Sequence, residues 1–127
     1  MKTRIVLLSI VAVLAFACKH SKSTEKTTGP APTTYRAIVS FGSSGSGIDT
    51  KTVASLESYI MSFGKAEGKT LTYDKVNWGK EGEVDYCFPL SELSNGRQKD
   101  FVNGLINLTK SAKVVSIQEN AACTHKK

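Results

Sequence analysis

The chain has 127 residues, a length that fits a single domain, and its formal net charge at pH 7 is +6. The excess positive charge lies near the two ends, whereas residues 35–123 contain equal numbers of basic and acidic side chains. A neutral domain lacks the basic surface that binding to phosphate backbones requires, so the sequence argues against a nucleic-acid partner.

The first 17 residues have the pattern of a secretory signal peptide. Lys2 and Arg4 precede an almost entirely apolar run over residues 5–14, and the segment closes on the small residues of Ala15-Phe16-Ala17. The apolar run is shorter than the roughly 20 residues that a helix needs to cross a bilayer. We therefore expect residues 1–17 to be removed during export rather than to remain as a membrane-spanning helix.

A cysteine follows this segment directly. Residues 14–18, Leu-Ala-Phe-Ala-Cys, resemble the lipobox of bacterial lipoproteins, although the leucine stands four rather than three residues before the cysteine. In that class the cysteine is acylated and becomes the first residue of the mature chain. The resemblance therefore implies a lipid anchor at Cys18 and a location in the bacterial cell envelope, outside the cytoplasm. The alternative is an ordinary secreted protein in which Cys18 lies near the cleavage point by chance.

The cysteine count agrees with lipidation. The chain has three cysteines, and an odd thiol in an exported protein needs an explanation. If Cys18 carries lipid, Cys87 and Cys123 remain as an even pair, which an oxidising compartment allows to form a disulfide.

Residues 18–34 are predicted to be a lipidated cysteine followed by a flexible tether. Ser, Thr, Lys, Gly and Pro dominate residues 19–34, so this segment has too little apolar surface to offset the entropy of ordering it. We expect it to hold a domain formed by residues 35–123 just off a membrane surface. Residues 124–127 are expected to form a basic tail.

Strand and helix patterns alternate along the predicted domain. The predicted elements are a strand at 35–41, a helix from Asp49 or Thr50 to Gly64 or Gly68, strands at 70–78 and 83–90 joined as a hairpin, a helix capped by Ser94, and a last strand at 113–119.

This order is the split βαβ pattern of ferredoxin-like folds. It predicts an α+β domain, βαββαβ, in which a four-stranded antiparallel sheet carries two helices on one face. A different α+β order is the alternative, because strand alternation is poor around Lys75 and Trp78. The indole of Trp78 is expected to pack over the hairpin, and the alternative is an exposed aromatic residue for binding.

The loop at residues 42–47, GSSGSG, lies between a predicted strand and the start of a helix. Backbone amides and a helix N-terminus favour an anion there, which makes Gly45, Ser46 and Gly47 candidate binding residues with Arg36 or Asp49. The lysine of a phosphate-binding P-loop and the glycine spacing of a dinucleotide site are both missing from the sequence. A flexible crossover loop is therefore the simpler interpretation.

Cys87 and Cys123 allow two interpretations. Together with His125 they supply three ligands, whereas a structural zinc site usually has four, so a disulfide is the simpler interpretation. The pattern places Cys87 on the sheet face opposite the helices, and the predicted strand order separates its strand from the last one. A bridge needs Cα atoms within about 7 Å. We therefore expect one only if residues 120–123 leave the last strand and cross the open face.

The sequence offers little for catalysis. Its two histidines are His20, in the tether, and His125, near the C-terminus, so a nucleophile with a rigidly held histidine base is not expected. Glu81, Glu83 and Asp85 alternate along a predicted strand, and carboxylates can act in acid–base chemistry. A solvated acidic face is the simpler interpretation of these three.

Two stretches, residues 38–49 (IVSFGSSGSGID) and 78–87 (WGKEGEVDYC), resemble small uncharacterised bacterial envelope lipoproteins over most of residues 35–123. The resemblance implies no activity. We therefore expect a non-catalytic lipoprotein, anchored to a membrane through Cys18, whose domain binds a protein partner or a small envelope component without cofactor or metal. The alternative is a small enzyme or anion-binding protein that uses the loop at 42–47.

Overall fold

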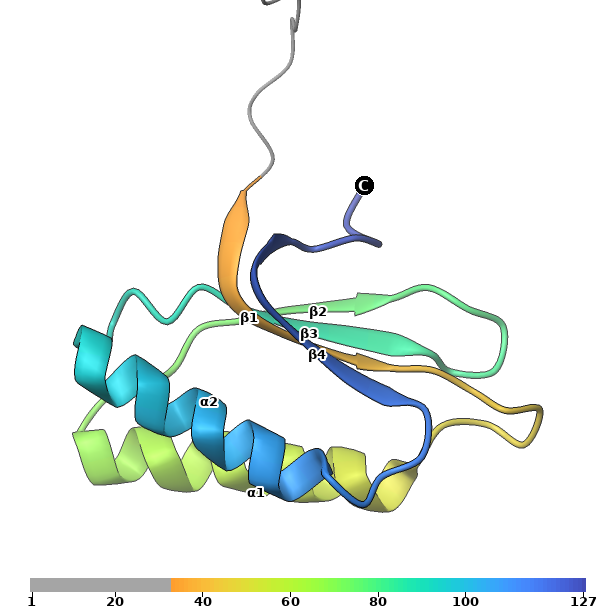
Figure 1. Ribbon diagram of the computed structural model, residues 1–127, viewed down its shortest axis with the longest axis horizontal. Coiled ribbons are helices and arrows are strands. Elements are labelled where there is room, and N and C mark those ends of the chain that lie inside the picture. Colours follow the sequence, from red (N-terminus) through yellow and green to blue (C-terminus); the bar gives the residue numbers. More distant parts are fainter. Residues whose placement is uncertain (1–32) are drawn as a thin grey trace, which may run out of the picture. The chain divides into compact units, whose positions relative to one another are not determined.

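The computed structural model describes residues 33–127. The elements of this part are β1 (Thr34–Phe41), α1 (Thr50–Glu67), β2 (Asp74–Asn77), β3 (Val84–Phe88), α2 (Asn95–Thr109) and β4 (Val115–Ala122). The strands form one antiparallel sheet in the order β2-β3-β1-β4. Both helices lie on one face of that sheet (Figure 1). The predicted α+β ferredoxin-like fold is therefore confirmed.

Helix α1 begins and ends as the sequence predicts. The Asp49 carboxylate accepts a 3.0 Å hydrogen bond from the Thr52 amide, which satisfies one of the free donors at the helix start. Gly68 ends the helix in the left-handed region, at φ 64°, and its amide donates to the carbonyls of Gly64 and Lys65. A side chain at residue 68 would strain that conformation, which explains why the helix stops at a glycine.

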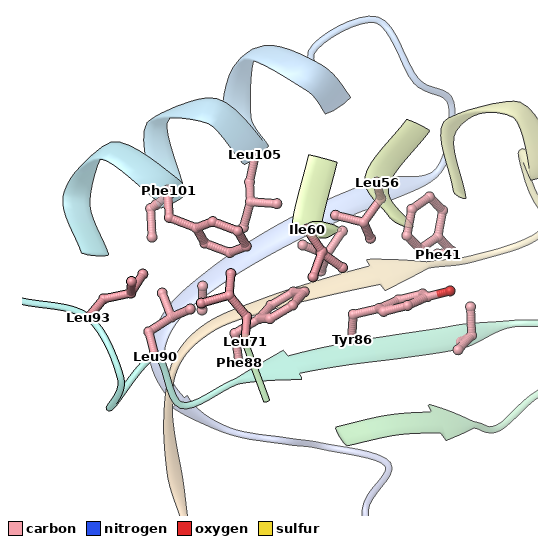
Figure 2. Packing of buried hydrophobic residues seen from close by; sticks show 14 residues of the cluster. Phe41, Leu56, Ile60, Leu71, Tyr86, Phe88, Leu90, Leu93, Phe101 and Leu105 are labelled. Carbon is pink, nitrogen blue, oxygen red and sulfur yellow. The ribbon is translucent and has the colours of Figure 1, made fainter. Parts of the chain in front are cut away.

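The main core fills the space between the sheet and the helices. Figure 2 shows side chains of α1 and α2 pointing toward aromatic residues of β1 and β3. Full burial of one such side chain stabilises the fold by about 1.5–3 kcal/mol, so this face supplies most of the apolar driving force. The labelled members of this core are Phe41, Leu56, Ile60, Leu71, Tyr86, Phe88, Leu90, Leu93, Phe101 and Leu105.

The second strand is shorter than predicted. The pattern predicts a strand over 70–78, but only Asp74–Asn77 pairs with β3. Leu71 is buried in the core instead, and the Thr72 amide donates to the Glu92 carboxylate at 2.8 Å rather than to a strand. Hydrogen bonds to a side chain thus take the place of strand pairing before β2 begins.

The ends of β1 and β4 bend away from the helices together, as Figure 1 shows. Asn120 has φ 52°, yet the register on either side of it is unbroken, with Tyr35 opposite Ala121 and Thr34 opposite Ala122. The expectation that residues 120–123 leave the last strand is therefore wrong. The paired strands carry Cys123 over the open face, and of residues 120–123 only Cys123 lies beyond the strand end.

This bend creates a second, smaller core on the sheet face opposite the helices. It consists of buried Tyr35, Ile38, Cys87 and Cys123, with Val76 and Ala121 packed against it. Within residues 33–127, no helix combines the length and apolarity that crossing a membrane requires.

Candidate functional site

A groove of about 620 Å³ runs between helix α1 and the segment that leads into β2. Apolar side chains line most of it, and charged groups stand at its ends. We call this feature the α1–β2 groove. Its lining residues are Glu57, Ile60, Met61, Gly64, Lys65, Lys69, Thr70, Leu71 and Tyr73.

The floor of the groove depends on a close approach at Gly64. A Cβ atom at this position would lie 2.6 Å from the Lys69 carbonyl oxygen, so the chain after α1 packs directly on the helix backbone. Ile60 and Leu71 form the buried floor beside this contact. The side chain of Met61, in contrast, is 69% exposed, which makes it the most exposed large apolar residue of residues 33–127.

One end of the groove is polar and internally paired. Glu57 accepts a 2.7 Å hydrogen bond from the Tyr86 hydroxyl and a 3.0 Å bond from the Lys75 ammonium. These two donors, Tyr86 first, lower the pKa of Glu57 below its ordinary value. The pKa of Lys75 is raised by Tyr86 and by Glu57. Because its carboxylate is held in this pair, Glu57 is poorly placed to act as a general base.

The strand that directly follows the groove-lining Tyr73 lacks a neighbour on one side in the described sheet. β2 pairs only with β3 in the sheet of residues 33–127, so its other edge presents unpaired backbone groups. Tyr73, which is 38% exposed, stands at the start of this edge and packs its ring against Tyr86 and Phe88. The groove thus offers apolar side-chain contacts next to backbone donors and acceptors, which is the arrangement that an extended peptide uses.

A second cluster lies on the opposite sheet face, and we call it the open-face cluster: Trp78, Asp85, Cys87, Cys123 and His125. The carboxylate of Asp85 accepts a 2.9 Å bond from the Trp78 indole N–H and lies 2.6 Å from Nδ1 of His125. The Trp78 and His125 rings stack with their centroids 4.1 Å apart. Cys87 and Cys123 form a disulfide, with a Cα–Cα distance of 6.0 Å.

The expectation of a solvated acidic face is wrong for Asp85, whose side chain is fully buried, whereas Glu81 is exposed and Glu83 is half-buried. Trp78 and His125, whose rings stack on each other, both contact the Asp85 carboxylate on this face. A buried carboxylate must be hydrogen-bonded to be tolerated, and Trp78 and His125 are its partners. His125, predicted in a basic tail, is thereby held against the sheet.

The last residues of the chain make a further contact with this face. The Lys126 ammonium donates to the Asp74 carboxylate at 2.6 Å and to the Tyr35 hydroxyl at 2.8 Å. These contacts raise the pKa of Lys126 to about 12, with Asp74 the larger cause, and Lys126 in turn lowers the pKa of Asp74.

The loop at 42–47 is placed at the end of β1, as predicted. Gly45 and Gly47 have φ values of 94° and 83°. Ser46 and Gly47, but not Gly45, border a shallow hollow of about 290 Å³ that Lys113 also lines. The surroundings do not favour an anion, because the Asp49 carboxylate already occupies the Thr52 amide and Ser43 donates to Glu81.

Arg36, the expected partner of that loop, is not near it. Arg36 lies close to the start of β1, whereas the loop follows the other end of the strand, and its guanidinium pairs with Glu119 at 2.5 Å. Cys18, the predicted lipid-attachment residue, lies outside the described residues.

Sequence reasoning missed both the groove and the buried state of Asp85. Met61 directly follows the buried Ile60 and falls outside the stripe of Leu56 and Ile60, which is a sequence signal for an exposed apolar residue. Nothing comparable marks Asp85, because its burial depends on the bend of β1 and β4. Comparison of the chain with protein-family models, with curated proteins and with solved structures finds no match.

Proposed function

We propose that this protein is a lipid-anchored lipoprotein of the bacterial cell envelope that binds an extended segment of a partner protein in the α1–β2 groove. The binding is non-catalytic. Anchoring rests on the sequence of residues 1–18, and partner binding rests on the groove.

The observation that carries the binding proposal is the position of two exposed apolar side chains beside an open strand edge. Met61 is 69% exposed and Tyr73 is 38% exposed, and both line the same groove. Apolar side chains gathered at one exposed place mark interaction sites more often than scattered ones do. An extended peptide would pair its backbone with β2 and insert an apolar side chain between Met61 and Tyr73.

The charges around the groove favour an acidic segment. Lys65 and Lys69 stand at the end away from Glu57, and Lys65 forms no ion pair with any other residue in 33–127. A carboxylate on the partner can pair with Lys65 without displacing an existing bond. Opposite charge at the rim mainly sets partner choice and association rate.

Binding without catalysis agrees with the side chains present in the groove. Its one carboxylate, Glu57, is paired with Tyr86 and Lys75. His125 is the histidine of the described residues, and it lies on the opposite face of the sheet with Asp85.

Anchoring is tested by fractionation. Replacing the acylated residue, as Cys18→Ser, should move the protein from the membrane fraction to the soluble fraction, because one covalent lipid supplies the membrane affinity. The unchanged chain, fractionated in parallel, is the control. A Cys18→Ser protein that stays with the membranes, together with an unchanged chain that carries no lipid mass, would overturn the anchoring proposal.

Groove binding is tested with a photo-crosslinking amino acid at position 61 of the full chain in intact envelopes. Ile106, an apolar residue of α2 that is 45% exposed, is the matched control position. We expect crosslinks from position 61 to map to one extended, acidic segment. A synthetic peptide of that segment should then bind the purified protein.

The peptide should bind Met61→Glu at least about tenfold more weakly than Ile106→Glu, because the introduced carboxylate repels an acidic peptide and removes an apolar contact. Equal crosslinking from both positions would rule out the groove as the binding site. So would a mapped peptide whose affinity is the same for Met61→Glu and Ile106→Glu.

A further inference from the structure

The open-face cluster brings together four residues whose side chains can bind metal ions. Ligand atoms of Asp85, Cys87 and Cys123 lie within 4.8 Å of one another, and all three residues are buried. His125 follows Cys123 by two residues, and its Nδ1 atom lies 2.6 Å from the Asp85 carboxylate. In the structure the two sulfurs are bonded to each other.

We infer that reduction of the Cys87–Cys123 disulfide converts this cluster into a tetrahedral Zn²⁺ site. The two thiolates, the Asp85 carboxylate and the His125 imidazole are its ligands. Two sulfurs, one nitrogen and one oxygen form a set that zinc accepts. The groove on the other face of the sheet takes no part, so this inference is independent of partner binding.

The chemistry balances with a dithiol as the reductant. Two electrons and two protons pass from the dithiol to the Cys87–Cys123 bond, which gives two thiols, and the dithiol becomes a disulfide. Zn²⁺ then displaces the two thiol protons to solvent as it binds the sulfurs. The bonded sulfurs are not thiolates, so the oxidised protein lacks half of the ligand set.

Charge explains why the reduced cluster takes a cation. Asp85 is completely buried, and two thiolates next to its carboxylate would place three negative charges in a small apolar space. Isolated buried charges are very costly, so the reduced cluster must either keep its protons or bind a cation. Zn²⁺ neutralises two of these charges directly.

The geometry requires only local movement. Ligand atoms around tetrahedral zinc lie about 3.3–3.8 Å apart. Those of Asp85, Cys87 and Cys123 lie within 4.8 Å of one another, and the two sulfurs move apart once the S–S bond opens. Cys123 lies just beyond the end of β4 and can shift with the residues after it. His125 already contacts Asp85, and its imidazole must move toward the sulfurs together with the segment after β4.

Trp78 would orient the site. Its indole N–H already donates to Oδ1 of Asp85 at 2.9 Å. Metal-binding carboxylates are commonly held by such a hydrogen bond, which fixes the oxygen that faces the metal. Trp78 is therefore a positioning residue in the proposed site.

The test uses the full chain carrying Cys18→Ser, so that the remaining cysteines of the protein are Cys87 and Cys123. The protein is reduced with a phosphine and titrated with Co²⁺, which reports thiolate ligands by charge-transfer absorption and tetrahedral geometry by its visible bands. We expect one Co²⁺ per reduced chain, displacement of that Co²⁺ by Zn²⁺, and no such spectrum from the oxidised protein.

Variants identify the ligands. Asp85→Asn and His125→Ala should each weaken Co²⁺ binding by about tenfold or more and alter the visible bands. Glu81→Gln changes an exposed carboxylate between β2 and β3 whose partner is Ser43, and Lys127→Ala changes the same C-terminal segment as His125. Neither control should change the affinity or the spectrum.

Thermal unfolding separates a folded site from thiols in an unfolded chain. Zn²⁺ should raise the melting temperature of the reduced protein and leave that of the oxidised protein unchanged. The inference is overturned if reduced, folded protein gives no tetrahedral Co²⁺ spectrum. It is equally overturned if Asp85→Asn and His125→Ala bind like the controls, or if Zn²⁺ does not stabilise the reduced chain.

Discussion

The Cα atom of Cys123 lies 6.0 Å from that of Cys87, although β1 separates the strands of these two residues in the sheet. Bending of the paired ends of β1 and β4 over the open face makes this contact possible. The disulfide therefore ties the residue after β4 to β3 across the open face.

Removal of the disulfide should destabilise the domain strongly. The bond joins residues 36 positions apart, and the chain-entropy model gives a stabilisation of roughly 4 kcal/mol for a loop of that size. We expect the oxidised protein to lose most of this on Cys87→Ala with Cys123→Ala, as measured by urea unfolding in the absence of metal. Equal stability of the double variant and the oxidised chain would contradict this.

Gly64→Ala should destabilise the domain, even though alanine is the better helix former by about 1 kcal/mol. The new Cβ would lie 2.6 Å from the Lys69 carbonyl oxygen, so the chain after α1 must move. We expect a net loss of about 1–3 kcal/mol.

The matched control is Gly96→Ala in α2, where an added Cβ meets no atom within 4 Å. That change should leave stability unchanged or raise it by up to about 1 kcal/mol. Thermal unfolding of both variants is the measurement. Similar melting temperatures would show that the chain after α1 accommodates a Cβ at residue 64 without loss of stability.

Glu57→Gln should reduce stability at neutral pH and have no effect at low pH. The pKa of Glu57 is lowered in the folded state by Tyr86 and Lys75, so its contribution is present above the ordinary pKa of 4.5. That contribution disappears as the pH falls through the lowered folded-state value.

Because the Glu57 and Lys75 side chains are 43% and 47% exposed, solvent screening limits the effect at pH 7 to about 1 kcal/mol or less. Melting temperatures of the two proteins should therefore converge between pH 5 and the acid limit of folding, in the range of roughly pH 2–3. A constant difference across this range would mean that the charge of Glu57 does not matter.

Trp78 is the single tryptophan of the chain, so its fluorescence reports on the open-face cluster. His125→Ala removes the ring that stacks on it at 4.1 Å and uncovers one side of the indole. We expect a red-shifted and changed emission, with a stability loss of about 0.5–1.5 kcal/mol. Lys127→Ala in the same segment should leave the spectrum unchanged, and an unchanged spectrum for His125→Ala would place the histidine away from the indole in solution.

The element order could be predicted because it depends on local patterns. Leu56 and Ile60 repeat at helical spacing, Asp49 and Gly68 mark the helix ends, and β3 consists of strand-forming residues bounded by Pro89. Each of these signals acts within a few residues, and together they determine the fold class.

The candidate sites could not be predicted in the same way, because they depend on contacts between distant residues. Asp85 belongs to an alternating acidic pattern, and its burial follows from the bend at Asn120 and the docking of His125. The groove likewise requires Leu71 to turn inward where the pattern predicts a strand. Tertiary packing overrode the local preference at each of these places.

The strand that begins the described fold is one of the two central strands of the sheet. β1 has a neighbour on both edges, and its ladder with β4 starts at the first strand residue, Thr34, opposite Ala122. A pull on the preceding residues therefore acts along β1 and shears two rows of hydrogen bonds at once, whereas an edge strand such as β2 would peel off one bond at a time. Force applied at the start of β1 therefore meets more resistance than the same force applied to β2.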